Sequence, residues 1–309
     1  GFAPRPVSAD EGIERIEITS GTGETIKENE SEPHAANTLA EAIVDEQVPE
    51  EPMPAEEAET PAAVAEKTIL TANSVWQHHN AFRGAWGNGV SRRKNIPIDW
   101  DGDSQHNILW KREIPVHGYN SPVLWGNRLF LSGANNSQRI VYCLDSQTGE
   151  VLWQKHADNI SGSPASPPKT TDDTGLAAPT LTVNHHSVFA IFGTGDIIAF
   201  GHEGHRQWAR NLGVPANHYG HSSSLLTWEE KVFVQYDTQN GSKVMALDVY
   251  TGHTVWETPR SNGVSWASPI LAQVDGKWQL VLSANPDVAA YDIDSGKELW
   301  RVNCLSGEV

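Results

Sequence analysis

The sequence predicts an all-β protein, a β-propeller built from four-stranded antiparallel blades. Three observations predict it: a Trp-bearing segment recurs along the chain, an Asp- and Gly-containing turn precedes most copies, and short apolar strands separate the copies. Trp110, Trp153, Trp208, Trp256 and Trp300 are separated by 43, 55, 48 and 44 residues. Repeats of roughly 40 to 50 residues are typical of propeller blades.

The turn before each Trp has a nearly constant spacing. In the first complete copy, Asp145 stands eight residues before Trp153 and Gly149 stands four residues before it. The Asp carboxylate can accept backbone N–H bonds within a turn, and Gly takes a positive φ without steric cost. A single hairpin of this kind is marginal in water, so we expect the copies to stack on one another. The predicted blade motif comprises Asp145, Gly149, Trp153, Gly204, Trp208, Asp248, Gly252, Trp256, Asp292, Gly296 and Trp300, and the copy ending at Trp208 lacks the Asp.

A second sequence mark precedes the first strand of each repeat. It reads Asn-Ser-Pro at 120–122, Ala-Ala-Pro at 177–179, Ser-Ser-Ser at 222–224 and Ala-Ser-Pro at 267–269. Pro suits the first residue of a strand, where its missing N–H matters least. Each repeat then contains three strands, the Asp/Gly turn and the Trp strand. We predict about four blades, ending near residues 153, 208, 256 and 300, with the Trp rings packed between adjacent blades.

The chain divides into two parts of different composition. Residues 1–72 are predicted to be a disordered acidic linker rich in Glu, Pro and Ala, and residues 73–309 are predicted to form the propeller. Residues 1–70 contain seventeen Asp and Glu against four Lys and Arg, and no aromatic residue after Phe2. Such a segment cannot bury enough apolar surface to offset its ordering entropy. Most of the net charge of −17 lies there, and this acidity argues against a nucleic-acid partner.

The ends of the chain and its cysteines bear on compartment and completeness. No signal peptide or membrane-spanning apolar run is present, but a chain that starts at Gly1 leads us to expect an upstream export signal, anchor or domain. Cys143 and Cys304 provide neither a disulfide framework nor a zinc site. The isolated Trp110 segment is interpreted as the outer strand of a blade. Since only nine residues follow Trp300, we expect an arc of about half of a seven- or eight-bladed ring.

Taken together, these motifs resemble the PQQ-like β-propeller repeat proteins of bacteria. The resemblance rests on the Asp-x-x-Thr-Gly-x-x-x-Trp turns, the Ser-Pro strand starts and the lead-in segment WQHHNAFRGAWGNGVS at residues 76–91. This segment resembles the Trp-Pro-x-x-Arg-Gly-Pro…Gly-Val-Ser opening of exported members, with Gln77 and Ala85 standing where Pro is commoner. The superfamily includes quinoprotein alcohol dehydrogenases and the propeller lipoprotein of the outer-membrane barrel-assembly machine. The resemblance covers residues 74–309 and implies a periplasmic or cell-envelope location in a bacterium.

Two functions follow from the resemblance, and a third stays open. Quinoprotein dehydrogenases combine a vicinal Cys-Cys disulfide, a Glu/Asn/Asp set for Ca²⁺ and an Asp general base. This chain has no Cys-Cys pair, and the repeated Asp residues already have a role in the blade turns. The favoured function is a non-enzymatic scaffold that binds a protein or a small-molecule or sugar ligand, with no catalytic residue and no cofactor. The alternative is a PQQ- and Ca-dependent dehydrogenase that oxidises an alcohol or sugar, and a sugar-binding module of a larger protein is a third possibility.

Candidate binding residues come from the register of the repeats. The second sequence mark ends at residues 122, 179, 224 and 269. The residues three positions before these ends are Tyr119, Leu176, His221 and Trp266. The innermost strands of a propeller line its channel, so these side chains are expected to gather at one mouth and hold a peptide, a sugar or a planar ligand. The alternative is that they only fill space. The predicted rim comprises His117, Tyr119, Asn120, His218, Tyr219, His221 and Trp266.

Two histidine pairs have a spacing that raises the question of a metal site. They are His202 with His205, and His218 with His221. Neither pair has the helical context that would bring both rings to one face, and the first lies in an Asp/Gly turn where polar residues are expected. The sequence therefore predicts no metal site.

Overall fold

The computed structural model describes residues 75–307. The chain divides into two units, Gly1–Val64 and Ala65–Val309, and all described residues belong to the second. The predicted acidic linker at 1–72 lies outside the described residues.

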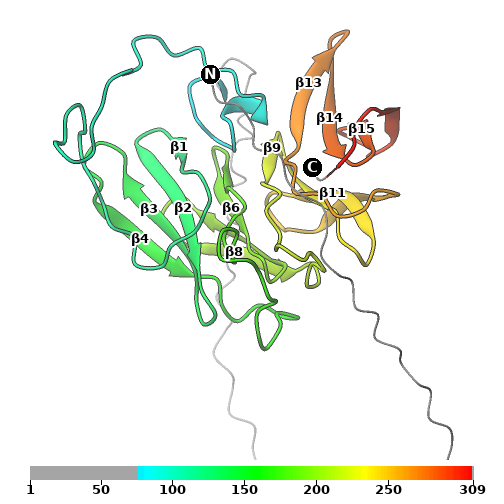
Figure 1. The fold of residues 1–309 in the computed structure, drawn as a ribbon, viewed down its shortest axis with the longest axis horizontal. Coiled ribbons are helices and arrows are strands. Elements are labelled where there is room, and N and C mark those ends of the chain that lie inside the picture. Colours follow the sequence, from blue (N-terminus) through cyan, green and yellow to red (C-terminus); the bar gives the residue numbers. More distant parts are fainter. Residues whose placement is uncertain (1–74, 308–309) are drawn as a thin grey trace, which may run out of the picture. The chain divides into compact units, whose positions relative to one another are not determined.

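Four antiparallel four-stranded sheets follow one another along the chain, each with its strands in sequence order (Figure 1). They confirm the predicted all-β propeller with about four blades. A single turn of 3₁₀ helix, η1 (Ala85–Gly87), precedes the sheets. The strands are β1 (Val123–Trp125), β2 (Arg128–Ala134), β3 (Arg139–Asp145), β4 (Val151–His156), β5 (Thr182–Val183), β6 (Ser187–Ile191), β7 (Asp196–Gly201), β8 (Arg206–Asn211), β9 (Leu226–Trp228), β10 (Lys231–Tyr236), β11 (Ser242–Asp248), β12 (Thr254–Arg260), β13 (Ile270–Val274), β14 (Lys277–Ala284), β15 (Asp287–Asp292) and β16 (Glu298–Asn303).

The Asp of the blade motif closes the turn between the third and fourth strands of a sheet. In the first blade, Asp145 Oδ1 accepts the backbone N–H groups of Gln147 at 2.8 Å and Thr148 at 2.9 Å. These bonds, led by that from Gln147, hold the pKa of the Asp145 carboxyl below its ordinary value. Asp248 and Asp292 accept the equivalent N–H groups in the third and fourth blades. The motif carboxylates are therefore engaged within their own turns.

The motif Trp of each of the first three blades reaches into the motif turn of the next blade. The indole Nε1 of Trp256 donates to Ile293 O at 3.1 Å, the carbonyl that follows Asp292. The ring lies over Gly296, where a Cβ would overlap the indole and where φ is +69°. Gly is therefore required there for both space and conformation. Trp110, Trp153 and Trp208 make the same contact, donating to Ser146 O, His202 O and Val249 O beside Gly149, Gly204 and Gly252.

Trp110 and Trp300 differ from the other motif Trp residues, the first in its backbone and the second in its contact. Trp110 makes the inter-blade contact, but residues 107–110 are not a strand as predicted, because no described strand lies beside them to complete a ladder. Trp300 is 38% exposed and its Nε1 donates to Gln279 Oε1 of its own sheet at 2.8 Å. The outward face of the fourth blade thus leaves a large aromatic ring uncovered.

The hydrophobic core lies between successive sheets. Separate clusters fill the three spaces, with Phe130 and Phe200 between the first and second blades, Phe189 and Met245 between the second and third, and Tyr291 among the residues between the third and fourth. Neighbouring blades share buried side chains in this way, so each one stabilises the next.

The lead-in segment crosses the inner strands of all four blades. His79 O accepts the N–H of Leu124 in β1 at 2.7 Å, and Asn80 O accepts that of Val183 in β5 at 2.9 Å. Further along, η1 lies against β9 and β13. Figure 1 shows this segment in cyan between β1 and β13. It joins the inner edges of the blades into one unit.

An aromatic cluster fixes the lead-in segment against the third and fourth blades. The ring of Trp86 lies 4.5 Å from that of Trp76, 4.8 Å from that of Trp278 and 6.4 Å from that of Trp228. Helices long and apolar enough to cross a membrane do not occur between residues 75 and 307.

Candidate functional site

Three residues of the predicted rim form one aromatic group. The ring of His218 lies 4.1 Å from that of Tyr219 and 5.2 Å from that of Trp266. Trp266 Nε1 donates to Gly220 O at 2.9 Å, which holds the indole against the preceding loop. Tyr219 is 39% exposed, so its ring remains available to a ligand. The structure thus brings these three side chains together at the start of the third and fourth blades.

His117 and Tyr119 form a second aromatic pair at the start of the first blade. Their rings lie 5.8 Å apart in a T-shaped, nearly perpendicular arrangement, and Tyr119 is 53% exposed. Residues 170–175 connect this pair to the first group. Gly175 lies against the Tyr119 ring, and the N–H of Thr171 donates to Tyr219 O at 3.2 Å.

A cavity of about 320 Å³ opens beside this loop. His117 lines one side, and the polar side chains of residues 135–137 and 170–172 line the rest. Exposed aromatic rings beside hydrogen-bonding groups are the usual composition of a ligand or protein contact surface.

Asn120 ties two blades together. Its Nδ2 donates to Ser132 O at 2.7 Å and to Ala177 O at 2.8 Å, and its Oδ1 accepts the N–H of Ser132 at 3.1 Å. Because these bonds occupy both ends of the amide, Asn120 contributes to the rim by positioning the first strand of its blade.

His221 lies in the protein interior, 0% exposed, with its ring centred 5.1 Å from that of Tyr236. Neither ring nitrogen has a hydrogen-bond partner among the described residues. Burial lowers the pKa of His221 to about 4, so the ring is neutral at pH 7. His221 therefore does not present its side chain at the mouth, although its register is equivalent to that of Tyr119.

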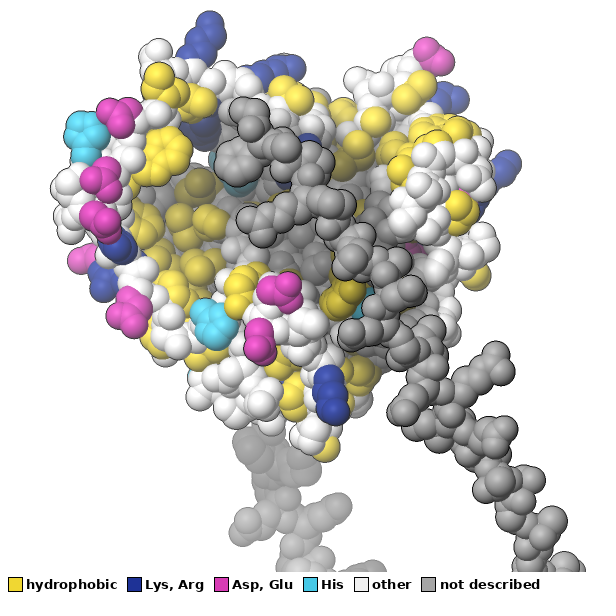
Figure 2. Space-filling model, viewed as in Figure 1, with side chains coloured by type: hydrophobic (Ala, Val, Ile, Leu, Met, Phe, Trp, Pro, Cys, Tyr) yellow, Lys and Arg dark blue, Asp and Glu magenta, His cyan; other side chains and the backbone are white. Residues whose placement is uncertain are grey.

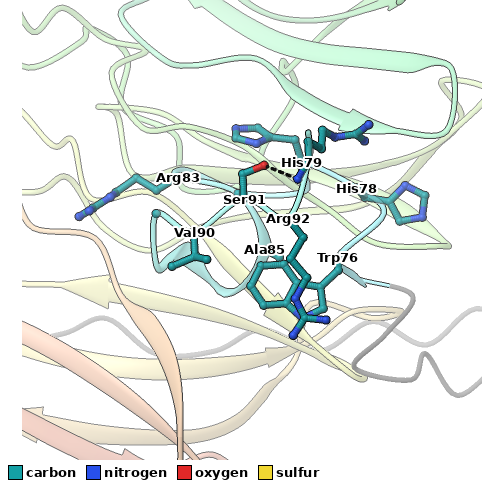
Figure 3. Close-up of a pocket in the computed structure, with 11 residues that line it drawn as sticks. Trp76, His78, His79, Arg83, Ala85, Val90, Ser91 and Arg92 are labelled. Atoms are coloured by element: carbon teal, nitrogen blue, oxygen red, sulfur yellow. Dashed lines mark hydrogen bonds between the residues drawn. The ribbon is translucent and has the colours of Figure 1, made fainter. Parts of the chain in front are cut away.

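A second cavity, of about 330 Å³, is formed by the lead-in segment and the two residues that follow it (Figure 3). We call it the lead-in pocket; it is lined by Trp76, His78, His79, Arg83, Gly84, Ala85, Gly89, Val90, Ser91, Arg92 and Arg93. Figure 3 shows Arg83 and His78 on opposite sides, with Ser91 and His79 between them. Ser91 Oγ accepts the N–H of Arg93 at 3.2 Å, which closes the turn at the edge of the pocket.

The histidines of the lead-in pocket pack against the first blade. The His78 ring stacks on Trp125 with centroids 3.9 Å apart, and its Nδ1 accepts the N–H of Gly126 at 3.3 Å. Burial, followed by the nearby positive charge of Arg93, lowers the pKa of both His78 and His79. Both rings are therefore neutral at pH 7.

The sequence did not single out the arginines of this pocket. The motif Trp76-x₆-Arg83-Gly84 was used only for the family resemblance. Arg83, Arg92 and Arg93 lie within eleven residues of one another in a chain with a net charge of −17. This concentration of arginine could have indicated an anion-binding site.

No group of three or more His, Cys, Asp or Glu side chains within residues 75–307 is placed to hold a metal ion, including the pairs at His202 and His218. Cys143 is buried in β3 and Cys304 is exposed, and neither is bonded to another cysteine. Burial also raises the pKa of the Cys143 thiol to about 11.

The surface in Figure 2 carries acidic and basic side chains intermixed with hydrophobic ones. On the face drawn in Figure 2, the basic side chains do not form a continuous stripe.

Comparison with known proteins gives a family. The family model described as outer membrane protein assembly factor BamB matches residues 107–265 and 242–309. The chain belongs to this family. The match spans all four blades and confirms the resemblance to the PQQ-like β-propeller repeat proteins.

Individual relatives carry the same description. The BamB protein of Alkalilimnicola ehrlichii is 27% identical over 208 residues, covering 63% of this chain and 49% of the relative. That of Burkholderia pseudomallei is 24% identical over 218 residues, covering 59% of this chain and 54% of the relative. The chain thus spans about half the length of the relatives it matches.

Solved structures of two kinds are similar to this chain. BamB from Moraxella catarrhalis is 19% identical with a TM-score of 0.45, covering 64% of this chain and 56% of that one. A quinohemoprotein alcohol dehydrogenase from Pseudomonas putida HK5 is 14% identical with a TM-score of 0.51, covering 75% of this chain and 41% of that one. The second likeness shows a shared propeller fold and nothing about activity.

Proposed function

We propose that this chain is the propeller part of a bacterial cell-envelope scaffold that binds polypeptides during the assembly of outer-membrane proteins. The observation that carries the proposal is the family match across residues 107–309. Relatives of that family are named outer membrane protein assembly factors. A rigid propeller displays its loops on a common face, which suits a protein that holds other chains.

The rim supports polypeptide binding by its composition. Tyr119 and Tyr219 expose large, rigid rings on either side of the loop at residues 170–175. Tyr side chains supply contact area at a low conformational-entropy cost and retain a hydroxyl for hydrogen bonding. The Asn, Ser and Thr side chains around the adjacent cavity add donors and acceptors for a peptide backbone.

The same proposal holds that the protein is not an enzyme and binds neither PQQ nor Ca²⁺. Three observations support it: the motif carboxylates are engaged in their own turns, the cysteines are unpaired, and the lead-in segment covers the inner strands. In the alternative, a quinoprotein dehydrogenase, PQQ would supply the redox chemistry with Ca²⁺ beside it, and no group of three or more His, Cys, Asp or Glu side chains among residues 75–307 is placed to hold a metal ion.

Binding of an outer-membrane β-barrel polypeptide, labelled with a fluorophore and kept unfolded before mixing, tests the proposal. We expect saturable binding by anisotropy, weakened about tenfold or more in the double variant Tyr119→Ala/Tyr219→Ala. One anchor of this kind typically contributes more than about 1.4 kcal/mol, which corresponds to a factor of ten. Tyr250→Ala is the matched control, because Tyr250 is 38% exposed but lies in the turn after β11.

Two results would reject the proposal. One is the absence of binding by the unaltered protein, and the other is equal weakening in the double variant and in Tyr250→Ala. A neutral oligosaccharide added in excess should not compete, since the proposed ligand is a polypeptide.

A further inference from the structure

The lead-in pocket has a charge opposite to that of the protein as a whole. Arg83, Arg92 and Arg93 line it together with two histidines, and no carboxylate is among its lining residues. The complete chain carries a net charge of −17. Three exposed arginines therefore line one cavity of about 330 Å³ and give it a positive charge.

The three arginines have no carboxylate partner among residues 75–307. Arg93 Nη2 donates to the backbone carbonyl of Gln77 at 2.8 Å. The guanidinium of Arg92 stacks over the Trp76 ring, 4.2 Å from its centroid. Elsewhere in the described chain, carboxylates pair with Arg128, Arg139, Arg260 and Arg301.

The backbone of the lead-in segment holds these side chains in place. Arg83 itself has a φ of 62°, and Trp86 has a φ of 61°, conformations that residues with a Cβ rarely adopt. Such outliers persist only where the surroundings enforce them, and they concentrate at functional sites.

Two glycines leave the room that the pocket needs. A Cβ on Gly89 would lie 2.8 Å from Arg83 Nη2, and one on Gly84 would lie 3.2 Å from His79 Nδ1. Both glycines also have positive φ, of 74° and 82°. The observed placement of Arg83 and His79 therefore depends on glycine at these two positions.

We propose that the lead-in pocket binds a phosphate-bearing ligand, held by Arg83, Arg92 and Arg93. Guanidinium groups donate paired N–H bonds that match the oxygens of a phosphate, and several of them suit a group with more than one negative charge. The cavity has the size of a small-molecule site. A free phosphorylated molecule and a phospholipid headgroup share this chemistry. The site is separate from the rim and does not depend on polypeptide binding there.

Calorimetric titration with pyrophosphate at low ionic strength tests the proposal on the full chain. We expect saturable binding at one site. Arg83→Gln and Arg92→Gln should each weaken it about tenfold or more, whereas Lys111→Gln, which removes the same charge from an exposed position outside the pocket, should not. Gly89→Ala keeps every charge but displaces Arg83, so it should weaken binding as well.

Sedimentation with vesicles identifies the source of the phosphate. Binding to phosphatidylglycerol vesicles but not to phosphatidylcholine vesicles, lost in Arg92→Gln, would assign the pocket to an anionic headgroup. Pyrophosphate binding without vesicle binding would assign it to a soluble ligand. The proposal is overturned if neither probe binds, or if Lys111→Gln weakens binding as much as the pocket variants do. Circular dichroism melts of each variant identify any that fails to fold.

Discussion

The buried imidazole of His221 should make the free energy of unfolding depend on pH. Substituting this one residue should remove that part of the pH dependence. His221 is fully buried and its ring nitrogens have no hydrogen-bond partner among the described residues. Burial lowers its pKa from 6.5 to about 4. In the unfolded chain the ring has its ordinary pKa. Between pH 6.5 and about 4 the unfolded state therefore binds a proton that the folded state does not bind.

The direction and size of the effect follow from these two values. Because the pKa of His221 is lower in the folded state, its contribution to the free energy of unfolding is complete above pH 6.5 and is lost as the pH falls toward 4. Each pKa unit corresponds to about 1.4 kcal/mol, so the free energy of unfolding should fall by about 2 kcal/mol between pH 7 and pH 5 from this residue alone. Measurement at pH 5 avoids the range in which most carboxylates titrate.

Urea unfolding followed by Trp fluorescence at both pH values provides the measurement. His221→Leu is the comparison, because Leu has a similar volume and no titrating group, and replacing an unpartnered polar group costs little. The decrease in the free energy of unfolding from pH 7 to pH 5 should be about 2 kcal/mol larger in the unaltered protein. Equal decreases in the two proteins would refute the assignment of a buried, neutral His221.

Three further predictions concern packing, a buried ion pair and the cofactor. Trp256→Ala should lower the free energy of unfolding by about 3–5 kcal/mol in urea titrations, and Trp300→Ala by much less, because Trp300 lies on an uncovered face. Arg260 Nε lies 2.9 Å from Asp237 Oδ1 with both side chains fully buried, so Arg260→Ala should cost about 3–5 kcal/mol by leaving a buried carboxylate unpaired. The double variant Asp237→Leu/Arg260→Met should recover much of that loss, and an additive loss would contradict the reasoning. Titration with PQQ in the presence of Ca²⁺ should not quench Trp fluorescence saturably, and tight quenching would favour a dehydrogenase.

The fold could be predicted because each repeat carries its own turn residues and Trp within a short stretch of sequence. Three of the four turns have an Asp acceptor at their first residue, and all four have a positive-φ glycine four positions later, which show in the first copy as Asp145 and Gly149. The inter-blade contact of Trp153 then follows from its fixed place after the turn. Trp110 shows the limit of this reasoning, since its ring packs beside Gly149 while the strand predicted at residues 107–110 is absent. A strand requires a neighbour, and the spacing of one chain does not supply it.

The sequence was sufficient to locate the rim but not to assign a role to each of its residues. Register placed Tyr119 and His221 at equivalent positions, yet one ring faces solvent and the other faces the core. Side chains next to a strand turn to either side according to what packs there, which spacing does not reveal. Asn120 illustrates the same point, because one of its partners, Ala177, lies 57 residues away in the next blade.

The lead-in segment was recognised by resemblance, and its role appears only in three dimensions. Its carbonyls at His79 and Asn80 bond to the inner strands of two blades that start more than 40 residues further along the chain. Contacts over such separations leave no periodic trace in the sequence.

Hydrogen exchange of the full chain, with and without an unfolded outer-membrane β-barrel polypeptide, tests the central claim most directly. The account predicts slower amide exchange in the presence of the polypeptide at residues 117–120, 170–175 and 218–220, with little change in the outer strands. An unchanged exchange pattern, or protection confined to segments away from these residues, would contradict the assignment of the rim as the polypeptide-binding surface.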